Sequence, residues 1–443
     1  MTQAAPLPSR HETQPVLVVG GGVVGISTAI WAQREGHNVT VIDKGTPEDR
    51  ASFGNAGVLA SASVLPVTMP GLLGKIPKMI LNRSEPVFLR WPYLPRLLPW
   101  ALRYLSHANE ADARRIASAL QPIIGTSLQD HLALADCTPA LRHIKPCDFA
   151  VLYRDRGAFK ADALGWQIRE SLGFAWDLHD GADRTAYDPV LDAGLGCLAA
   201  LKNHGQITDP GAYLADLRAH FTAAGGTITQ AAVTDIMHTD GQVRGVMTDA
   251  GPIYGKAVAI TAGAWSPLLT RKLGVKIPVE AESGYHLEFW DPSFMPRTPT
   301  LVPSRKLIFS PMQGRLRVAG AVEFGGLHNK GQDAVFDILR KATQSVLPGL
   351  TYSRETRWFG HRPAPTDSIP VIGPLDHIRG VFLGFGHQHV GLTGSARTGQ
   401  ILAQLISGKR PNIDLSPYRV SRFVDTSPRK AAQFNAFEHM ERV

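Results

Sequence analysis

The chain of 443 residues is 44% hydrophobic and 19% charged, which excludes an intrinsically disordered protein and a small single-core domain and predicts two domains. Its formal net charge of +8 favours anionic cofactors, anionic substrates or an acidic membrane surface, although charge spread over the whole surface gives the same total. No run of five basic residues occurs, so the sequence gives no support for nucleic-acid binding.

The cysteine positions and the lengths of the apolar runs argue against further kinds of protein. Cys137, Cys147 and Cys197 form no CxxC pair, so we expect neither a disulfide scaffold nor a metal site. No run of 18 apolar residues is present, and residues 1–14 are polar without the apolar segment of an export signal. We therefore expect a protein of the cytoplasm, either free or peripheral to the inner face of the cell membrane.

A nucleotide-binding fingerprint lies near the N-terminus. Val16–Val19 is typical of a buried parallel strand, and Gly20, Gly22 and Gly25 follow it in a G-x-G-x-x-G pattern. The first glycine permits a tight turn, the second lets the backbone approach a pyrophosphate, and the third lets a helix pack against the strand. A helix predicted over Ile26–Glu35 would direct its free N–H groups toward the phosphates.

An acidic residue after the next strand indicates the kind of nucleotide. A strand is expected over His37–Ile42, and Asp43 lies 18 residues after Gly25. A carboxylate at this distance can accept hydrogen bonds from both ribose hydroxyls, whereas an NADP site would place an arginine there. The motif alone does not choose between FAD and NAD.

Five later segments carry a resemblance to one family. They are Ser52–Gly57 (SFGNAG), His204–Pro210 (HGQITDP), Ile260–Ser266 (ITAGAWS), Phe359–Gly373 (FGHRPAPTDSIPVIG) and Gly384–Ser395 (GFGHQHVGLTGS). With these segments the chain resembles the D-amino-acid dehydrogenase group of the DAO superfamily of flavoenzymes, from about Val16 to about Tyr418. The resemblance implies FAD as the cofactor and an oxidoreductase of amino-acid catabolism.

The resemblance also implies how the flavin is held. The Ser52–Gly57 loop would run past the pyrophosphate toward the flavin, and a strand near Val233 would meet the adenine. A strand over Val381–Leu383 and a helix from Leu392 would aim N–H groups at one point, where they stabilise a reduced anionic flavin. The residues assigned to the cofactor are Gly20, Gly22, Val23, Val24, Gly25, Asp43, Lys44, Ser52, Asn55, Ala56, Gly57, Val233, Ala262, Gly263, Trp265, Gly386, Gly391, Leu392 and Thr393.

A single G-x-G-x-x-G is present in the chain. A reductase that draws electrons from NADH into FAD usually needs a second nucleotide fold, so we expect the substrate itself to be the electron donor. No histidine or cysteine stands where some relatives attach the flavin, with His387 and His389 the nearest, so we expect FAD to be non-covalent.

The scattered motifs predict an interleaved architecture. The expected fold class is α/β, with a Rossmann-like FAD-binding domain of the glutathione-reductase type and an α+β substrate domain built on an antiparallel sheet that faces the flavin. The FAD-binding domain would comprise residues 14–62, 195–272 and 355–420, the substrate-binding domain 63–194 and 273–354, and the tails 1–13 and 421–443. Within the substrate domain, a helix is expected through Glu110–Leu134 and strands over Phe149–Tyr153, Tyr285–Phe289, Leu307–Ser310 and Arg315–Ala319.

Residues 64–105 admit two interpretations. Pro70–Leu81 mixes apolar residues with lysines, and such a segment could touch a membrane surface, where a quinone acceptor is found. Proline-broken segments make poor surface helices, which favours ordinary core and lid packing instead.

Three residues are assigned to catalysis. The guanidinium of Arg362 suits a carboxylate, and the equivalent arginine of the family binds the substrate carboxylate. Tyr285 matches the family's G-Y-S region and is expected to cover that carboxylate, although a core tyrosine on a strand fits equally well. His387 is expected to hydrogen-bond substrate or flavin, with His361 and His389 as alternatives.

One departure from the family bears on the substrate. Many relatives place a second carboxylate-binding arginine just before an R-x-R-V-x-G strand, here Arg315–Gly320, but this chain reads SPMQG over Ser310–Gly314 and Arg305 is out of register. A D-amino acid, a secondary amine, an imino acid and an amine without a carboxylate therefore all stay open as substrates.

Three alternative functions are consistent with the sequence. One is a dehydrogenase that transfers a hydride from Cα to flavin N5, gives an imine that hydrolyses to the keto acid, and passes electrons to a quinone or other carrier. The second is an oxidase of the glycine or sarcosine type that uses oxygen. The third is a non-catalytic FAD-bearing subunit, which the missing arginine would suit best.

Overall fold

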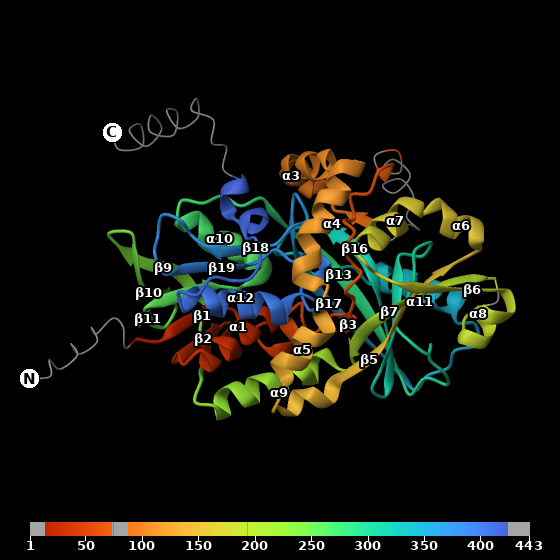
Figure 1. Ribbon diagram of the computed structural model, residues 1–443, viewed down its shortest axis with the longest axis horizontal. Coiled ribbons are helices and arrows are strands. Elements are labelled where there is room, and N and C mark those ends of the chain that lie inside the picture. The colour runs from red at the N-terminus through yellow and green to blue at the C-terminus, as the bar shows by residue number, and fades with distance from the viewer. Residues whose placement is uncertain (1–13, 73, 75–86, 193, 424–443) are drawn as a thin grey trace, which may run out of the picture.

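The computed structural model describes residues 14–72, 74, 87–192 and 194–423. Two sheets lie beside one another, the smaller one on the left of Figure 1 among α1 and α12 and the larger one on the right. This arrangement confirms the predicted mixed α/β fold with a Rossmann-like parallel sheet. Most of the predicted segment Pro70–Leu81 and of the C-terminal tail, and the whole of the tail 1–13, lie outside the described residues.

The smaller sheet has the strand order β18-β19-β12-β1-β2-β8. Its strands are β1 (Val16–Val19), β2 (Val39–Asp43), β8 (Thr227–Gln230), β12 (Ala257–Ile260), β18 (Val371–Pro374) and β19 (Val381–Phe385), and all neighbours pair in parallel except β18 with β19. β1 is apolar throughout because both of its faces are covered: Val16 and Val18 belong to one core cluster, and Leu17 and Val19 to another.

Helices cover one face of this sheet and a small sheet covers the other. On one face lie α1 (Val23–Arg34), α9 (Pro210–Ala223) and α12 (Ser395–Ile406). On the other lie α10 (Ser266–Lys272) and the three-stranded sheet of β9 (Val233–Thr239), β10 (Gln242–Thr248) and β11 (Gly251–Tyr254). This layering leaves the carboxyl ends of the parallel strands free to form a site.

The larger sheet has the order β17-β13-β16-β15-β14-β5-β7-β3. Its strands are β3 (Val58–Leu59), β5 (Ile144–Tyr153), β7 (Cys197–Ile207), β13 (Val279–Trp290), β14 (Thr300–Val302), β15 (Leu307–Met312), β16 (Arg315–Phe324) and β17 (Arg354–Pro365), with β4 (Val87–Leu89) beside β16 and β6 (Trp176–Asp180) beside β7. It is antiparallel, as expected, except where β14 meets β5 and β4 meets β16.

The remaining helices surround the larger sheet and its junction with the smaller one. They are α3 (Leu94–Ser106), α4 (Glu110–Ile124), α5 (Ser127–Ala135), α6 (Arg156–Ala161), α7 (Ala163–Ser171), α8 (Gly181–Tyr187) and α11 (Asp333–Val346). The helix expected through Glu110–Leu134 is two helices, because α4 ends at Ile124, with Gly125 as its C-terminal cap, and α5 starts at Ser127.

One further expectation differs from the structure. The final helix begins at Ser395, not at Leu392, since residues 391–394 make turns closed by Gly394 N–H to Val390 O and Ser395 N–H to Leu392 O. Within the segments assigned to the FAD-binding domain, β3, β7 and all of β17 except Arg354 pair within the larger sheet. All strands of the smaller sheet do come from those segments.

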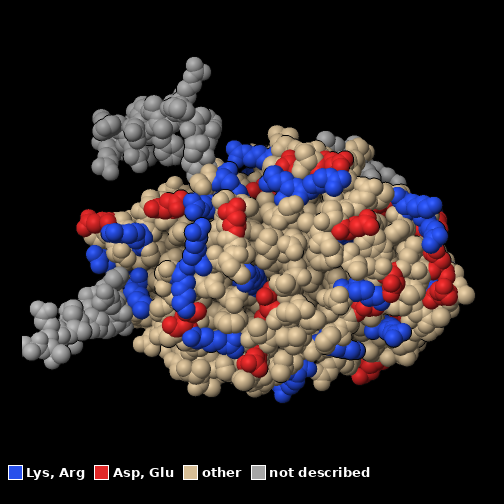
Figure 2. All heavy atoms as spheres, viewed as in Figure 1, with Lys and Arg blue, Asp and Glu red and all other residues tan. Residues whose placement is uncertain are grey.

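Charged side chains of both signs are interspersed over the face shown in Figure 2. This distribution agrees with spread surface charge as the origin of the net +8. No helix within the described ranges is long and apolar enough to cross a membrane.

Candidate functional site

A cavity of about 1630 Å³ lies where the carboxyl ends of the parallel strands meet the larger sheet. Open α/β sheets bind ligands at this edge. Sixteen residues predicted to hold the cofactor line it: Gly20, Gly22, Val23, Val24, Asp43, Lys44, Ser52, Asn55, Ala56, Val233, Ala262, Gly263, Trp265, Gly391, Leu392 and Thr393. The other three, Gly25, Gly57 and Gly386, do not line the cavity but shape the backbone around it.

The glycine-rich loop packs as its spacing predicts. Gly20 has φ +106°, and a Cβ on it would lie 2.8 Å from Cα of Ala262. A Cβ on Gly25 would lie 1.9 Å from the carbonyl oxygen of Gly20, so only glycine lets α1 approach the turn. A Cβ on Gly22 would meet only Oγ of Ser52, at 3.6 Å, and would project into the cavity. The loop therefore leaves space for a ligand at Gly22.

Asp43 is held by protein donors on one side of the cavity. Its Oδ1 accepts the N–H of Gly45 at 2.9 Å, and its Oδ2 accepts Nε of Arg50 at 3.1 Å and the N–H of Gly21. The carboxylate thus braces the glycine loop while it lines the cavity. Its predicted bonds to ribose hydroxyls would add to these contacts.

The residues around the loop fit an anionic group. Nη1 of Arg50 is buried and has no hydrogen-bond partner among the described residues, although Arg50 lines the cavity. Nη1 of Arg218, from α9, donates to the carbonyl oxygen of Gly21 at 3.3 Å, and burial together with Arg50 lowers the pKa of Arg218. With the N-terminus of α1 beside it, Arg50 would hold the pyrophosphate of FAD, while Arg218 positions the glycine loop from behind. Arg218 has no signal in the linear sequence because it lies far from the loop along the chain.

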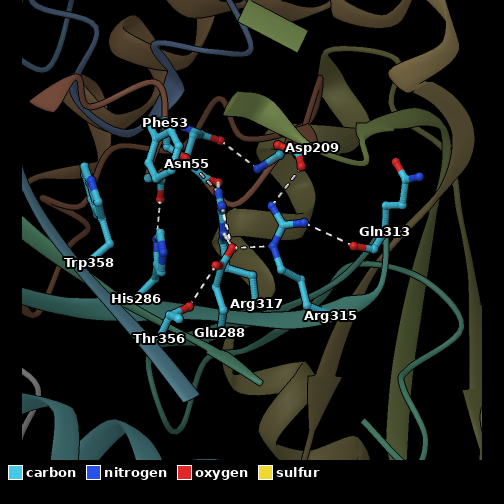
Figure 3. A network of polar contacts seen from close by, with 12 residues as sticks. Phe53, Asn55, Asp209, His286, Glu288, Gln313, Arg315, Arg317, Thr356 and Trp358 are labelled. Atoms are coloured by element: carbon cyan, nitrogen blue, oxygen red, sulfur yellow. Dashed lines mark hydrogen bonds and ion pairs between the residues drawn. The ribbon is translucent and has the colours of Figure 1, made fainter. Parts of the chain in front are cut away.

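A buried ion-pair network fixes the Ser52–Gly57 loop from below (Figure 3). Nη1 of Arg317, on β16, donates to the carbonyl oxygens of Phe53, at 2.9 Å, and Asn55. Nη2 of Arg317 lies 2.7 Å from Oε1 of Glu288 on β13, and Nε of Arg315 lies 2.6 Å from the same oxygen. Arg317 is 1% exposed, so its charge is balanced within the protein and not by water.

Two further contacts extend this network. Nη2 of Arg315 lies 3.1 Å from Oδ2 of Asp209, whose Oδ1 caps α9. Nδ1 of His286 donates to the carbonyl oxygen of Gly54 at 3.0 Å, and its ring stacks on Trp358. The R-x-R-V-x-G strand therefore positions the loop and α9.

Trp265 and Lys44 contact each other at the wall of the cavity. Trp265 and Val233 line the cavity, and Nζ of Lys44 lies 4.8 Å from the centroid of the Trp265 ring. This cation–π contact joins Lys44, just after β2, to Trp265, in the turn after β12. The two segments come together only through strand pairing.

Arg362 and Glu282 face each other from β17 and β13, and both line the cavity. Nη1 of Arg362 lies 3.0 Å from Oε1 of Glu282, and the side chains are 26% and 8% exposed. Nε2 of Gln388 lies 3.4 Å from Oε2 of Glu282 and 3.0 Å from the hydroxyl oxygen of Tyr104 on α3. A Cβ on Gly284 would lie 2.4 Å from Cζ of Arg362, so the missing side chain makes room for the guanidinium. The sequence prediction included Arg362 but missed its acidic partner.

The three candidate histidines all line the cavity. His387 is 3% exposed, its Nε2 lies 2.9 Å from Oγ1 of Thr398, and burial lowers its pKa to about 4. Burial also lowers the pKa of His361 and His389, and Nδ1 of His361 lies 3.1 Å from Oγ of Ser283. Burial thus favours the uncharged form of all three histidines.

Tyr285 lies on the other face of the larger sheet, which corrects its predicted role over the substrate. Successive side chains of a strand point to opposite faces. Glu282 of β13 lines the cavity, so Tyr285, three residues later, packs in the core beneath α11. Its hydroxyl donates to Glu323 and accepts the N–H of Gln332 at 3.1 Å. The alternative of a core tyrosine on a strand is the one the structure supports.

Comparisons with known proteins agree with this geometry. A D-amino-acid oxidase from Bradyrhizobium diazoefficiens is 37% identical over 420 residues, which cover 93% of this chain and 100% of that protein. A D-amino acid dehydrogenase from Rhizobium rhizogenes is 29% identical, over 92% of this chain and 99% of that protein. The crystal structure of glycine oxidase from Geobacillus kaustophilus superimposes with a TM-score of 0.72 at 21% identity, over 93% of this chain and 99% of that one.

The model of the DAO family, described as FAD dependent oxidoreductase, matches residues 15–405. The predicted resemblance and the predicted FAD cofactor are thereby confirmed. This chain belongs to the DAO family of FAD-dependent oxidoreductases.

Proposed function

We propose that the protein oxidises an α-amino acid, or a related secondary or imino acid, at Cα and passes the electrons to a quinone or another carrier. The observation that carries this proposal is the Arg362–Glu282 pair in the cavity. One cationic and one anionic group beside each other match the two charges at the reacting end of an amino acid. The relatives named D-amino-acid oxidase and D-amino acid dehydrogenase support this substrate class.

Each partner of the pair would take one end of the zwitterion. Arg362 uses Nη1 for Glu282, and its partly exposed guanidinium can bind the α-carboxylate with its remaining N–H groups. Glu282 would accept the substrate ammonium and its proton, since oxidation needs the nitrogen lone pair. Gln388 holds the second oxygen of Glu282 in place.

FAD, when bound, supplies a two-electron acceptor for the hydride that leaves Cα, which gives an imine that hydrolyses to the keto acid. The neutral His387 bonds Thr398 on α12 and would keep the turn before that helix in place. The buried walls around Leu392 and Phe385 exclude water from this region.

An exposed apolar surface supports a membrane-associated acceptor. On α3, Leu98 and Leu102 are 48% and 61% exposed, and Trp91 just before it is 61% exposed. Arg96 and Arg103 are exposed on the same helix. A basic amphipathic helix of this kind suits an anionic lipid surface. We propose that α3 rests on the inner face of the membrane, where quinone is available.

A second function, an oxidase that uses oxygen, is favoured by the 37% identity to a protein named an oxidase. Anaerobic mixing of the purified flavoprotein with D- and L-amino acids, prolines and N-methyl amines tests the oxidation itself, with loss of the visible flavin colour expected. No bleaching by any of these amines would leave the third alternative, a non-catalytic subunit. Peroxide release on aerobic turnover, in place of quinone reduction, would show the oxidase.

A further inference from the structure

We propose that Arg169 forms a second anion-binding subsite in the cavity, which takes a carboxylate at the far end of the substrate side chain. The inference rests on the proposed function and specifies its substrate class: amino acids with an acidic side chain.

Arg169 reaches the cavity from α7 and is 8% exposed. Its Nε donates to the carbonyl oxygen of Ala62 at 3.2 Å, and its Cζ lies 4.7 Å from the centroid of the Trp166 ring. Its Nη1 is buried and makes no hydrogen bond to any described residue. A guanidinium with a free donor at a cavity wall is a site that can receive an anion.

The charge of Arg169 is poorly balanced by the protein. The other arginines that line the cavity, Arg50, Arg357 and Arg362, each have a carboxylate oxygen within 4 Å, whereas Arg169 has none among the residues that the structure describes. Asp162 interacts electrostatically with Arg169, but its carboxylate accepts a hydrogen bond from the hydroxyl of Tyr153, at 2.7 Å, and forms no ion pair with Arg169. Burial lowers the pKa of Arg169, and a bound anion would offset that cost.

The walls around Arg169 suit a short hydrocarbon chain that ends in a charge. Phe149, Leu301 and Ile308 line the cavity and belong to the same apolar cluster as Trp166, over which Arg169 lies, and they can contact methylene groups. Ser63, Leu65, Ser304 and Lys306 line the cavity as well. The same cavity is therefore lined by the Arg362–Glu282 pair and by a second cationic group, Arg169.

Arg169 does not replace the second arginine that is missing before the R-x-R-V-x-G strand. Relatives of the resembling group place a second arginine before the R-x-R-V-x-G strand, and here residues 310–314 contain none. A cationic group from α7 lies in another part of the fold, so it would read the side chain and not the α-carboxylate. Loss of Arg169 should therefore change which amino acids are preferred and should not abolish oxidation as such.

A purely positional role is the competing explanation. The carbonyl of Ala62 binds Arg169, and the N–H of Ala62 donates to Nε2 of His204 at 3.0 Å, so the pair fixes the segment after β3. If that were the whole role, substitution of Arg169 would impair every substrate in the same proportion. The ratio of rates between an acidic substrate and its neutral amide distinguishes the two roles.

The experiment compares the FAD-loaded wild type with Arg169→Met and Arg169→Lys. Anaerobic flavin reduction is followed with aspartate against asparagine and glutamate against glutamine, in both enantiomers. For the reactive enantiomer we expect wild type to favour the acid over the amide by about tenfold or more in kcat/KM, the discrimination of one charge-assisted hydrogen bond. Arg169→Met should bring the ratio close to one, and Arg169→Lys should keep part of the preference.

The matched control is Arg156→Met on α6, a 60% exposed arginine that pairs with Asp180 outside the cavity and should keep the wild-type ratio. A wild type without preference for the acid, or an unchanged ratio in Arg169→Met, would overturn the subsite. Thermal denaturation of each variant shows whether it is folded, and Arg169→Lys carries the test if Arg169→Met is not.

Failure of the proposed function gives a different result. If no amine bleaches the flavin, binding of glutarate and of butyrate is measured by the change in flavin absorbance. Binding of glutarate that weakens about tenfold in Arg169→Lys or Arg169→Met, with butyrate as the reference, supports the subsite independently of catalysis. Equal binding of both acids by wild type, or equal glutarate binding by wild type and variants, contradicts it.

Discussion

Nη2 of Arg317 lies 2.7 Å from Oε1 of Glu288, and this pair is buried directly beneath the Ser52–Gly57 loop. The same guanidinium holds the carbonyl oxygens of Phe53 and Asn55. An ion pair in the larger sheet thereby fixes the backbone of a loop that lines the cavity, so we expect stability and flavin binding to depend on the same contacts.

Glu288→Gln should lower both the stability of the protein and its flavin content, because it leaves two buried arginines without their shared carboxylate. We expect the free energy of unfolding to fall by about 3–5 kcal/mol, the cost of breaking a buried pair. Urea unfolding measures this loss, and the ratio of flavin to protein absorbance should fall with it. Glu110→Gln breaks the exposed pair with Arg114 and should cost under about 1 kcal/mol. Equal losses in the two variants would show that the network is not important for stability.

Gly22→Val should give a folded protein without flavin. A side chain at Gly22 would meet only Ser52 within the protein, so the fold tolerates it, but it would occupy space that the cofactor needs. The expected result is a colourless protein with a wild-type circular dichroism spectrum. Gly22→Ala, with a smaller side chain, should retain part of the flavin. A yellow Gly22→Val protein would contradict the phosphate-loop assignment.

The glycine loop and the Glu282–Arg362 pair show how much of the site the sequence can predict. The glycine loop was predictable because its turn, strand and helix are adjacent in the chain, so spacing alone determines their geometry. The Glu282–Arg362 pair depends on the register of β13 against β17, in which these two residues are directly opposite. No local pattern contains that register.

Tyr285 illustrates the same limit. Its motif matched the family, but the face it occupies follows from the two-residue period of β13, which needs one residue of known orientation to fix it. The end of α4 at Ile124 was likewise missed because the apolar pattern continues across it into α5. Motifs formed by residues close together in the chain were thus predictable, whereas the tertiary contacts of those residues were not.

Arg362→Met should keep the flavin and lose affinity for the amino acid. The variant removes the carboxylate-binding donors and leaves Glu282 without its partner, so KM should rise by about 10- to 100-fold. Steady-state kinetics with the substrate found by flavin bleaching measures this. Arg357→Met, also on β17 and lining the cavity, is the matched control, since its guanidinium pairs with Glu355 and Asp333. Full retention of the wild-type KM by Arg362→Met would remove the carboxylate assignment.

Acid should destabilise the protein through buried histidines. His131 is fully buried, its Nε2–H donates to the carbonyl oxygen of Leu392 and its Nδ1 accepts from Tyr213, and burial lowers its pKa to about 4. Because the unfolded state takes up this proton near pH 6.5 and the folded state only near pH 4, stability is present above pH 6.5 and falls between these values.

His131→Gln should flatten this decline, since glutamine offers a donor and an acceptor without titrating. The slope of unfolding free energy against pH should decrease by about 1 kcal/mol per pH unit, the linkage of one proton. His238→Gln on the exposed end of β9 is the control and should keep the wild-type slope. An unchanged slope in His131→Gln would assign the acid sensitivity to other groups.

The exposed face of α3 gives the last prediction, which concerns the electron acceptor. If Leu98 and Leu102 insert into lipid, the double variant Leu98→Ser/Leu102→Ser should lose co-sedimentation with vesicles of anionic phospholipid and reduce membrane-dissolved quinone more slowly. Its turnover with a water-soluble dye acceptor should stay at the wild-type level, because α3 buries its opposite face, including Trp100 and Tyr104, and that face is unchanged. Leu141→Ser, at a comparably exposed leucine away from α3, should keep vesicle binding. Wild-type protein that stays in the supernatant with these vesicles would exclude membrane contact, and the acceptor would then be oxygen or a soluble carrier.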